Sequence, residues 1–393
     1  GLYQTYNGSM AKLIKNIDIY TGVGVVKNGF LRFSNKIEEI GEAKAFVTKG
    51  DDQVITVPKG AIIVPGFIDV HTHGGYGFDT MDADVDGLNR FMENLRREGL
   101  TSVFPTTITQ TKDNIKKALV SVAEAAKNNS MIRGIHLEGP FINADMNGAQ
   151  PAEYVIRPDL ALFKNWQKDA DGLIKLVTYA PEKSGSAFEA GLHNMGVVLS
   201  AGHTNQSYFK MNKGQTLASH VTHLYNRQSQ LEGREPGVTG YGVLTPSIKV
   251  EVIADGVHVS PEMIKLAYQL KGAKNIEVIT DSMRAKGQKE NEVSELGGQK
   301  VIVKNGAARL ENGHLAGSVL KYILAFRNIQ KFTGASIEEA VLMTSVNQAR
   351  EFGLNDVGSL EVGKRANFNL LNSDQDLLEN FLDGDGLKAV DQK

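Results

Sequence analysis

Short apolar runs rich in β-branched residues alternate with helical patterns through the middle of this chain. The eight strand candidates are Phe67–Val70, Thr101–Thr106, Ile132–Leu137, Leu173–Tyr179, Val197–Ser200, Ala218–Thr222, Lys249–Ala254 and Glu277–Thr280. Apolar spacings of three and four predict helices at residues 88–95, 115–127, 261–270, 319–332 and 337–353. Eight strands with intervening helices over roughly 280 residues are typical of a (β/α)8 barrel. We therefore predict an α/β fold of the TIM-barrel type.

The two ends of the chain carry a different pattern. Alternating stretches at residues 12–20, 24–33, 36–41 and 53–57 are broken by Gly, Asn and Asp, which favours strands and hairpins. The segment that starts at Gly358 ends in a similar strand. We predict that residues 10–64 and 355–393 build one small β-sandwich domain and that residues 65–354 form the barrel. Residues 1–9 are polar and patternless, and we expect them to be an artificial extension before a native start at Met10.

The composition excludes several kinds of partner. The 43 basic and 45 acidic residues leave a net charge of −2, so no bulk attraction to nucleic acid or anionic membrane is expected. The longest apolar runs are too short to span a bilayer. The chain has no cysteine, which excludes disulfides and thiolate metal ligands and fits a reducing cytoplasm. We therefore expect a cytoplasmic protein whose partners include a small molecule.

Polar residues follow five of the predicted strands at the point where each strand ends. They are His71, His73, Glu138, His203, His223 and Asp281. Active sites of barrels of this kind lie at the C-terminal ends of the strands. Four imidazoles and two carboxylates are a suitable ligand set for a hard-to-borderline divalent metal ion. The pattern predicts a metal-dependent hydrolase whose nucleophile is metal-activated water.

Each of these residues also has a plainer interpretation. His71 and His73 are two residues apart and share one strand face, although an isolated His-x-His often marks a polar loop. Glu138 precedes a Gly-Pro turn, where it is either solvated or a bridge between two ions through its two oxygens. Asp281 fits the N-cap of a following helix. Together with the other residues, a role as general base and acid is the better interpretation of Asp281.

Four other histidines are expected to have other roles. His220 lies three positions before His223 and so faces the opposite side of the strand, which favours a core or supporting role. His136 lies deeper than Glu138, and we expect it to be hydrogen-bonded and structural. His193 lies on a helical pattern and is expected to be structural. His314 lies in a glycine-flanked loop, where we expect it near the site without being a ligand.

Motifs along nearly the whole chain resemble those of one family. They are H-T-H-G-G, H-L-E-G-P, S-A-G-H-T-N, T-H-L-Y-N, G-R-E-P-G, I-A-D-G-V-H-V, T-D-S-M and H-L-A-G-S. H-x-H alone marks only the amidohydrolase superfamily. The combination of H-L-E-G-P, G-R-E-P-G and D-G-V-H-V is more specific, and it resembles the N-acetylglucosamine-6-phosphate deacetylases of that superfamily.

The resemblance implies how the metal ligands are divided. The better-occupied ion would be held by Glu138, His203 and His223. The second ion would be held by His71, His73, Asp281 and a shared Glu138. Because both histidines of the first motif are present, the chain is competent for one or two ions per subunit. Zinc is the expected ion, with iron, manganese and cobalt as alternatives.

The resemblance also implies roles in catalysis and substrate binding. Asp281 matches the catalytic acid and base, and His258 matches the residue that orients the acetyl carbonyl. Asn226 and Arg234 match contacts to the sugar phosphate. In the family that arginine comes from the neighbouring subunit, so the resemblance implies a homodimer in which Arg234 reaches the partner's active site.

A covering loop and two departures from the family pattern complete the expected substrate site. Leu315, Ala316 and Gly317 match a loop that covers the sugar. Gln150 stands where some members have a histidine that touches the substrate, and its amide can still donate to a hydroxyl. Arg227 stands where a small residue is frequent, so it either adds phosphate affinity or is solvated.

The resemblance implies hydrolysis of the acetamide of N-acetyl-D-glucosamine 6-phosphate to D-glucosamine 6-phosphate and acetate, as in amino-sugar catabolism. A deacetylase of N-acetylgalactosamine 6-phosphate and a cyclic-amide hydrolase share the same chemistry at the metal and stay open, because specificity lies in the loops. A non-catalytic sugar-phosphate sensor is a further alternative, although every expected ligand and the acid/base are present.

Overall fold

The computed structural model describes residues 10–47 and 50–389, so the predicted artificial extension at residues 1–9 lies outside the described residues. The chain divides into two compact units. One comprises Gly1–Ile68, Asn94–Thr101 and Ala335–Lys393, and the other comprises Asp69–Glu93 and Ser102–Gly334. The domain boundaries predicted after residues 64 and 354 stay a prediction.

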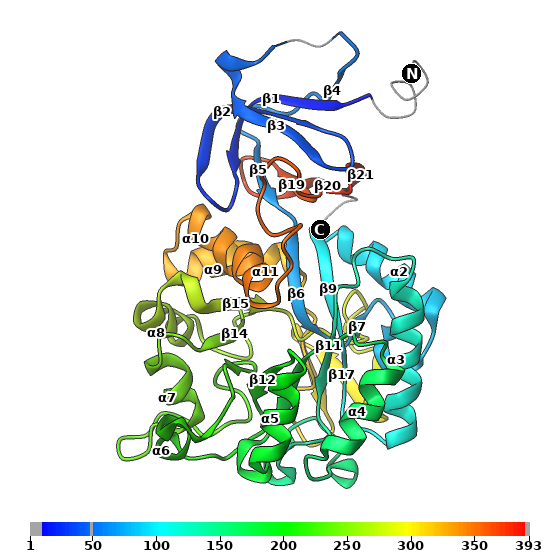
Figure 1. Cartoon of the computed structure of the whole chain (residues 1–393), viewed down its shortest axis with the longest axis vertical. Helices are drawn as coiled ribbons and strands as arrows, with labels where there is room; N and C mark the ends of the chain where they lie inside the picture. The colour runs from blue at the N-terminus through cyan, green and yellow to red at the C-terminus, as the bar shows by residue number, and fades with distance from the viewer. Residues whose placement is uncertain (1–9, 48–49, 390–393) are drawn as a thin grey trace. The chain divides into compact units, whose positions relative to one another are not determined.

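The predicted eight-stranded barrel is confirmed (Figure 1). Its strands are β6 (Phe67–Thr72), β9 (Leu100–Thr107), β10 (Ile135–Glu138), β11 (Ile174–Tyr179), β12 (Val198–Ala201), β13 (His220–Val221), β14 (Lys249–Ile253) and β15 (Ile276–Ile279). They pair in chain order from β6 to β15, and the strands from β9 to β15 pair in parallel. Beyond the last strand the Asp281 amide donates to the His71 carbonyl at 2.8 Å, which brings the two outer strand ends together.

Helices cover the outside of these strands (Figure 1). They are α2 (Val85–Arg96), α3 (Lys112–Ala126), α4 (Leu160–Asp169), α5 (Ser186–Asn194), α6 (Tyr208–Lys210), α7 (Gly237–Leu244), α8 (Pro261–Lys271) and α9 (Tyr322–Thr333). Every residue of β6, β9, β10 and β15 is buried, as expected for a parallel sheet covered on both faces. A charged side chain inside such a strand therefore needs a specific partner.

Both chain ends contribute strands to the same structure, as predicted, and these strands form one mixed sheet where we expected a β-sandwich. Its strands are β1 (Lys12–Tyr20), β2 (Val25–Phe33), β3 (Ile37–Glu42), β4 (Gln53–Val54), β5 (Ile62–Pro65), β19 (Phe368–Leu371), β20 (Leu377–Leu382) and β21 (Asp385–Lys388). A cluster that includes Leu31, Phe33, Ile63 and Phe368 forms its core. The helical segment predicted at residues 337–353 is present as α10 (Ile337–Val341), a wider turn at Leu342–Val346 and α11 (Asn347–Glu351).

Two smaller sheets lie in the loops after the outer strands of the barrel. One is a ribbon of β7 (Gly74–Gly75) and β8 (Phe78–Asp79). The other contains β16 (Val293–Leu296), β17 (Gln299–Lys304) and β18 (Ala307–Leu310) and was not predicted from the sequence. The three-stranded sheet packs through Leu296, Val301 and Leu310 in a cluster with Ile108 and Met283.

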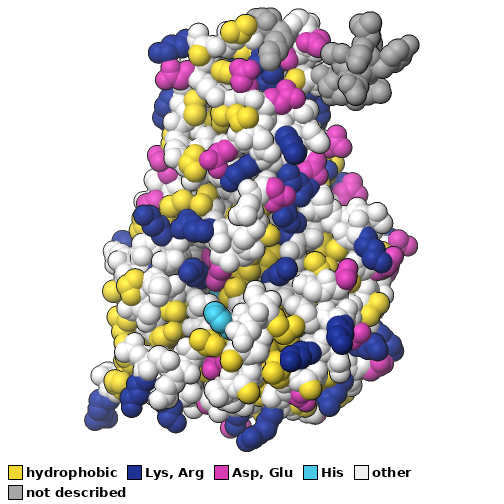
Figure 2. Space-filling view, viewed as in Figure 1, with side chains coloured by type: hydrophobic (Ala, Val, Ile, Leu, Met, Phe, Trp, Pro, Cys, Tyr) yellow, Lys and Arg dark blue, Asp and Glu magenta, His cyan; other side chains and the backbone are white. Residues whose placement is uncertain are grey.

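The face of the molecule in Figure 2 has no large region of a single charge sign. Basic and acidic side chains both occur across the face that Figure 2 shows, consistent with the net charge of −2. Within residues 10–47 and 50–389, no helix is long and apolar enough to cross a membrane.

Candidate metal centre and active site

The polar residues that follow the barrel strands converge around one carboxylate. Glu138 ends β10, and only 1% of its surface is exposed. Its Oε1 atom lies 2.9 Å from His73 Nε2 and 3.4 Å from His71 Nε2. Its Oε2 atom lies 3.3 Å from His203 Nε2 and 3.2 Å from His223 Nε2. Each oxygen of Glu138 therefore faces a separate pair of imidazoles.

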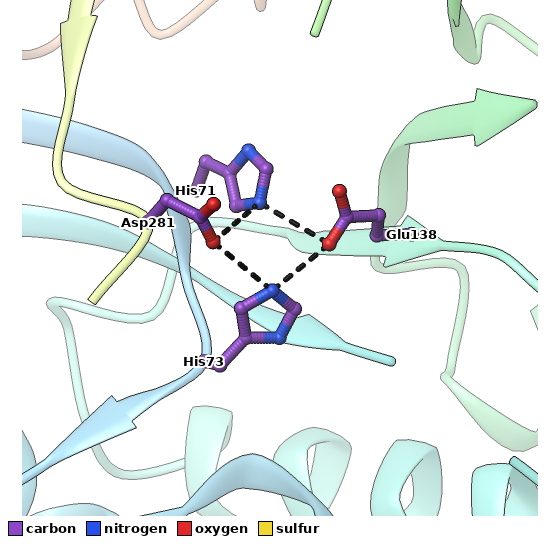
Figure 3. Close-up of side chains that lie close together, drawn as sticks. All are labelled: His71, His73, Glu138 and Asp281. Atoms are coloured by element: carbon purple, nitrogen blue, oxygen red, sulfur yellow. Dashed lines mark hydrogen bonds and ion pairs between the residues drawn. The ribbon is translucent and has the colours of Figure 1, made fainter. Parts of the chain in front are cut away.

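Asp281 completes the group on the Oε1 side. Its Oδ1 atom lies 3.1 Å from His71 Nε2 and 3.2 Å from His73 Nε2. Figure 3 shows the four side chains of this group pointing toward a common centre. Two sets of candidate ligand atoms result, each lying within 4.8 Å of one another: His71, His73, Glu138 and Asp281, and Glu138, His203 and His223.

The chemistry of the donors fits one or two divalent cations. All six side chains offer nitrogen or oxygen, which suits zinc and other borderline ions. When the four imidazoles are neutral, as metal ligation requires, the two buried carboxylates carry two negative charges, which a divalent cation would neutralise. The ring orientation also fits, because His203 Nδ1 lies 2.8 Å from the Met146 carbonyl and so donates to it. That hydrogen bond leaves the lone pair of His203 Nε2 for a metal.

The pKa values of the cluster reflect these opposed charges. Burial would lower the pKa of His73, but hydrogen bonds to Asp281 and Glu138 raise it to about 9. Burial would raise the pKa of Glu138, but the charge of His71 and the contacts with His203 and His223 hold it well below its usual value. Without a cation, protons on the imidazoles compensate the carboxylates. A metal ion must displace them, so metal binding should release protons.

A cavity of about 600 Å³ opens above these ligands. Of the residues proposed from the sequence, it is lined by His73, Glu138, Gln150, His203, His223, Asn226, Arg227, His258, Asp281, Leu315 and Gly317. His71 lies beneath it and is fully buried. Residues from strand ends far apart in the sequence thus share one cavity, which is large enough for a small ligand.

The comparisons with known proteins agree with this geometry. The model of the amidohydrolase family matches residues 62–389. The chain belongs to the amidohydrolase family. It is 42% identical over 377 residues to N-acetylglucosamine-6-phosphate deacetylase from Bacillus subtilis, covering 93% of this chain and 94% of that protein. A structure of N-acetyl-D-glucosamine-6-phosphate deacetylase from Mycobacterium smegmatis in complex with N-acetyl-D-glucosamine-6-phosphate aligns with a TM-score of 0.89, 28% identity and coverage of 96% of this chain and 99% of that one.

A related amidohydrolase is named for a different substrate. The N-acetylgalactosamine-6-phosphate deacetylase of Escherichia coli O157:H7 is 34% identical over 329 residues, covering 81% of this chain and 86% of that protein. The similarity therefore extends to deacetylases of both epimeric sugar phosphates.

Three of the expected substrate residues of this amidohydrolase make hydrogen bonds or packing contacts that the sequence could not predict. Gln150 accepts from the Thr109 amide at 2.8 Å and donates to Glu138 Oε1 at 3.1 Å, so its amide is tied to the metal cluster. Asn226 donates to the carbonyls of His223 and Leu224. Ala316 is fully buried in the cluster beside the three-stranded sheet.

Arg234, which we expected to contact the sugar phosphate, lies away from the cavity of its own chain. It is exposed in the loop before α7 and does not line the cavity of its own chain. Arg227 does line the cavity, and its side chain lies against Gly148. Its Nε atom is buried and has no hydrogen-bond partner within the described part of the chain.

The other histidines take the positions expected of them. His136 Nε2 lies 2.7 Å from Thr178 Oγ1, and burial lowers the pKa of His136 to about 3, so the ring is neutral. His193 lies in the last turn of α5. His314 lines the cavity and is exposed. His220 lies beneath the site with its Nε2 atom 2.8 Å from Glu251.

Two acidic residues of the site were missed in the sequence. Asp255 Oδ2 lies 2.7 Å from His258 Nδ1, and Asp255 Oδ1 accepts from the His258 amide. Glu251, in the middle of β14, contacts His71 and His220. The available signal was an acidic residue inside or directly after an apolar strand, Lys-Val-Glu-Val-Ile-Ala-Asp, where burial is unfavourable without a partner.

Proposed function

We propose that this chain hydrolyses the acetamide of N-acetyl-D-glucosamine 6-phosphate, releasing acetate and D-glucosamine 6-phosphate. The observation that carries the proposal is the Glu138 carboxylate at the cavity floor, with each oxygen facing its own group of metal ligands. The relatives that act on this sugar phosphate, as their names state, support the choice of substrate.

The residues that would hold metal are Glu138 and the five proposed ligands around it. One ion would be held by Glu138, His203 and His223, and a second by His71, His73, Asp281 and Glu138. A divalent ion bound there supplies Lewis acidity, which polarises the acetyl carbonyl and makes water a better nucleophile. Zinc is our expected ion, because its usual ligands in proteins are the imidazoles and carboxylates found here.

Asp281 is placed to move the proton. Its carboxylate lines the cavity and is 8% exposed. Burial would raise the pKa of Asp281, but the charge of His71 and hydrogen bonds from His71 and His73 lower it, so the group is ionised. In the proposed reaction Asp281 accepts the proton of the attacking water and delivers it to the departing nitrogen.

His258 is placed to bind the acetyl carbonyl. Asp255 accepts from Nδ1 of its ring, which fixes the ring and leaves Nε2 for the cavity. In the imidazolium form of this ring Nε2 also carries a hydrogen, and that donor would stabilise the oxyanion that develops during attack, where the loss of one donor typically costs about 10²–10³ in rate. Asp255 thus supports His258 by orienting it.

The phosphate contacts form a separate part of the proposal. Arg227 and Asn226 line the cavity of the same chain, and the buried, unpartnered Nε of Arg227 supports a direct contact with an anion. Arg234 lies outside that cavity on an exposed loop. Its position supports the expectation that it serves the active site of a second subunit.

An exposed apolar stripe supports a homodimer. Met263, Leu266 and Leu270 are 37%, 36% and 50% exposed on α8, at spacings of three and four that place them on one helix face. Hydrophobic side chains are visible in Figure 2 on the side of the molecule where Figure 1 places α8. Contiguous exposed apolar surface of this kind often marks a protein interface.

A phosphorylated amino sugar as substrate is also consistent with the cytoplasmic location that we expected.

Hydrolysis of four compounds tests the proposed activity, followed as acetate release for the three acetamides and as ring opening for dihydroorotate. Zinc-loaded protein should release acetate from N-acetylglucosamine 6-phosphate with a higher kcat/KM than from N-acetylgalactosamine 6-phosphate, and far higher than from unphosphorylated N-acetylglucosamine. Dihydroorotate should not be hydrolysed. The relative from Escherichia coli O157:H7 makes preference for the galactosamine epimer the second candidate function. Binding of the sugar phosphate without acetate release would favour a sensor and contradict the proposal.

A further inference from the structure

Glu251 is a carboxylate buried inside the barrel beneath the candidate metal centre. It is fully buried in β14 and does not line the cavity. Its Oε1 atom lies 2.8 Å from His71 Nδ1 and accepts the His223 amide at 3.2 Å. Its Oε2 atom lies 2.8 Å from His220 Nε2. Both oxygens are therefore engaged by groups beside or on the metal ligands.

A charge at this position needs an explanation. Moving a carboxylate from water into a protein interior costs several kcal/mol unless partners compensate. Its neighbours in β14, Val250, Val252 and Ile253, are buried apolar residues, so an apolar side chain would suit the strand. The contacts of Glu251 are the only features of the described chain that we find to favour a carboxylate here.

The contact with His71 has a defined chemical consequence. Because a carboxylate accepts at Nδ1, the His71 ring carries a hydrogen there, and Nε2, which faces Glu138 and Asp281, is the nitrogen that would bind an ion after giving up its own proton. His203 is oriented by a neutral carbonyl instead, that of Met146. His73 Nδ1 has no hydrogen-bond partner among residues 10–47 and 50–389. His223 Nδ1 likewise has none in this part of the chain, so among the described residues His71 is the one proposed ligand whose Nδ1 contacts a carboxylate.

We propose that Glu251 is the positioning residue that makes the chain a two-ion protein. It sets the tautomer and orientation of His71, and so determines the affinity of the ion held by His71, His73, Asp281 and Glu138. The ion held by Glu138, His203 and His223 depends on Glu251 much less. Among the described residues, Glu251 contacts these three ligands through one hydrogen bond, which it accepts from the His223 backbone amide. This inference rests on the proposed metal-dependent function.

Zinc binding to the metal-free full-length chain tests the inference. Bound zinc is counted by elemental analysis after equilibrium dialysis, and the two affinities are measured by competition with a chromophoric chelator. The wild-type chain should bind two ions. Glu251→Gln should weaken one of them by about 10–100-fold, the usual effect of losing a residue that orients a metal ligand, and leave the other unchanged. Glu251→Asp, which keeps a buried charge, should weaken the same ion if Glu251→Gln does not fold.

Glu189→Gln is the matched control. Glu189 is also a buried carboxylate held by side-chain hydroxyls, those of Tyr179 and Thr216, but it lies on α5 outside the metal cluster. This variant should bind two zinc ions with wild-type affinities. A general effect of removing a buried carboxylate would instead weaken zinc binding in both variants and would overturn the inference.

A double variant assigns the ion that is lost. His71→Gln should bind one zinc ion, and adding Glu251→Gln should change that remaining affinity by less than about twofold, because Glu251 acts through His71. The inference is overturned if Glu251→Gln keeps both wild-type affinities, if it loses both ions equally while the circular dichroism spectrum is native, or if the wild-type chain binds only one ion. Wild-type protein that binds two ions and releases no acetate would contradict the proposed activity but leave the role of Glu251 standing.

Discussion

Three of the six proposed metal ligands have left-handed backbone conformations. The φ angles are 47° for His203, 26° for His223 and 50° for Asp281. Residues other than glycine in such conformations cost about 1–3 kcal/mol each and persist where the surroundings hold them. Asp281 is held by two backbone hydrogen bonds, from its amide to the His71 carbonyl and from the Ser318 amide to its carbonyl. The strain thus lies where the strand ends turn their side chains toward a common point.

Replacing Asp281 by Asn separates proton transfer from binding. The amide keeps the shape of the side chain but cannot accept the proton of water, so kcat should fall by about 10²–10⁴-fold. KM should change by less than about threefold. Steady-state kinetics on zinc-loaded protein measures both, with bound zinc determined for each sample because Asp281 is also a proposed ligand. A kcat within threefold of wild type would remove Asp281 from the reaction.

The sequence predicted that these residues lie at strand ends, but it did not predict how their side chains are oriented. His71, Glu138 and His203 each follow an apolar run, and barrel geometry then predicts that they meet. Which oxygen of Glu138 faces which histidine depends on side-chain rotation, which strand positions do not determine. Glu251 and Asp255 were missed because their partners come from other strands or from a loop geometry without a pattern.

At the scale of elements, the short three-stranded sheet brings residues to the cavity. Arg309 of β18 and Leu315 just after it line the cavity, as do Leu296 of β16 and Ile108, which belong to the apolar cluster of this sheet. The barrel strands supply the proposed metal ligands, and this sheet supplies part of the wall around the ligand. Loops that vary on a constant barrel are where substrate specificity usually lies.

Val301→Ala tests whether the three-stranded sheet supports the cavity wall without supporting the proposed metal ligands. Val301 is fully buried in β17, and removing its two methyl groups should cost about 1–2 kcal/mol of local stability. We expect KM for the sugar phosphate to rise several-fold, because the wall loosens, while both zinc affinities stay at wild-type values. A loss of zinc together with substrate affinity would show that the sheet supports the metal centre as well.

The turn after β8 has a buried acid that should make stability depend on pH. Asp79 caps a short helical turn, accepting from the Met81 amide, and burial raises its pKa from 3.8 to about 6. The folded state therefore binds this proton more tightly than the unfolded state does. The stability associated with the protonated form is lost as the pH rises from the unfolded pKa through about 6.

Asp79→Asn should remove that dependence. Asn keeps an acceptor for the Met81 amide and cannot ionise, so its stability relative to wild type should increase by about 1 kcal/mol between pH 5 and pH 8. Chemical denaturation of both proteins at the two pH values measures the difference. An equal difference in unfolding free energy at pH 5 and pH 8 would mean that Asp79 does not titrate as described.

The elements themselves were predictable where their periodicity is strong. All eight barrel strands were predicted, with ends that shift by up to three residues. Helix α7, Gly-Val-Thr-Gly-Tyr-Gly-Val-Leu, was missed because its three glycines disfavour a helix locally and its surroundings override that preference. The sheet of β16 to β18 was missed although Asn305-Gly306 marks the hairpin between β17 and β18, a strong turn signal.

At the scale of the whole molecule, the proposal makes the active site depend on two subunits. Arg234 is exposed and does not line the cavity, and the apolar stripe of Met263, Leu266 and Leu270 is exposed in the single chain. If the stripe forms the interface, the chain should sediment as a dimer. The same assembly would supply Arg234 to the neighbouring cavity.

Mixing a variant that binds the phosphorylated sugar weakly, Arg234→Ala, with one that turns it over slowly, Asp281→Asn, tests this dependence. Arg234→Ala should raise KM for the phosphorylated sugar by about 10–100-fold and leave that for the unphosphorylated sugar unchanged, as expected for loss of a charge-assisted contact. Arg234→Ala and Asp281→Asn subunits, refolded together, should regain activity, because each hybrid dimer has one cavity with Asp281 and the partner's arginine. If Arg234 serves its own subunit, the mixture should be no more active than the two variants measured apart.

The central claim is that the ligands around Glu138 hold the metal that the hydrolysis requires. The most direct test is a zinc titration of metal-free protein in which bound zinc and acetate release from N-acetylglucosamine 6-phosphate are followed together. We predict that acetate release is absent without metal and rises in proportion to zinc bound per chain, and that Glu138→Gln abolishes both. Full acetate release by metal-free protein, or zinc binding that Glu138→Gln does not weaken, would contradict the account.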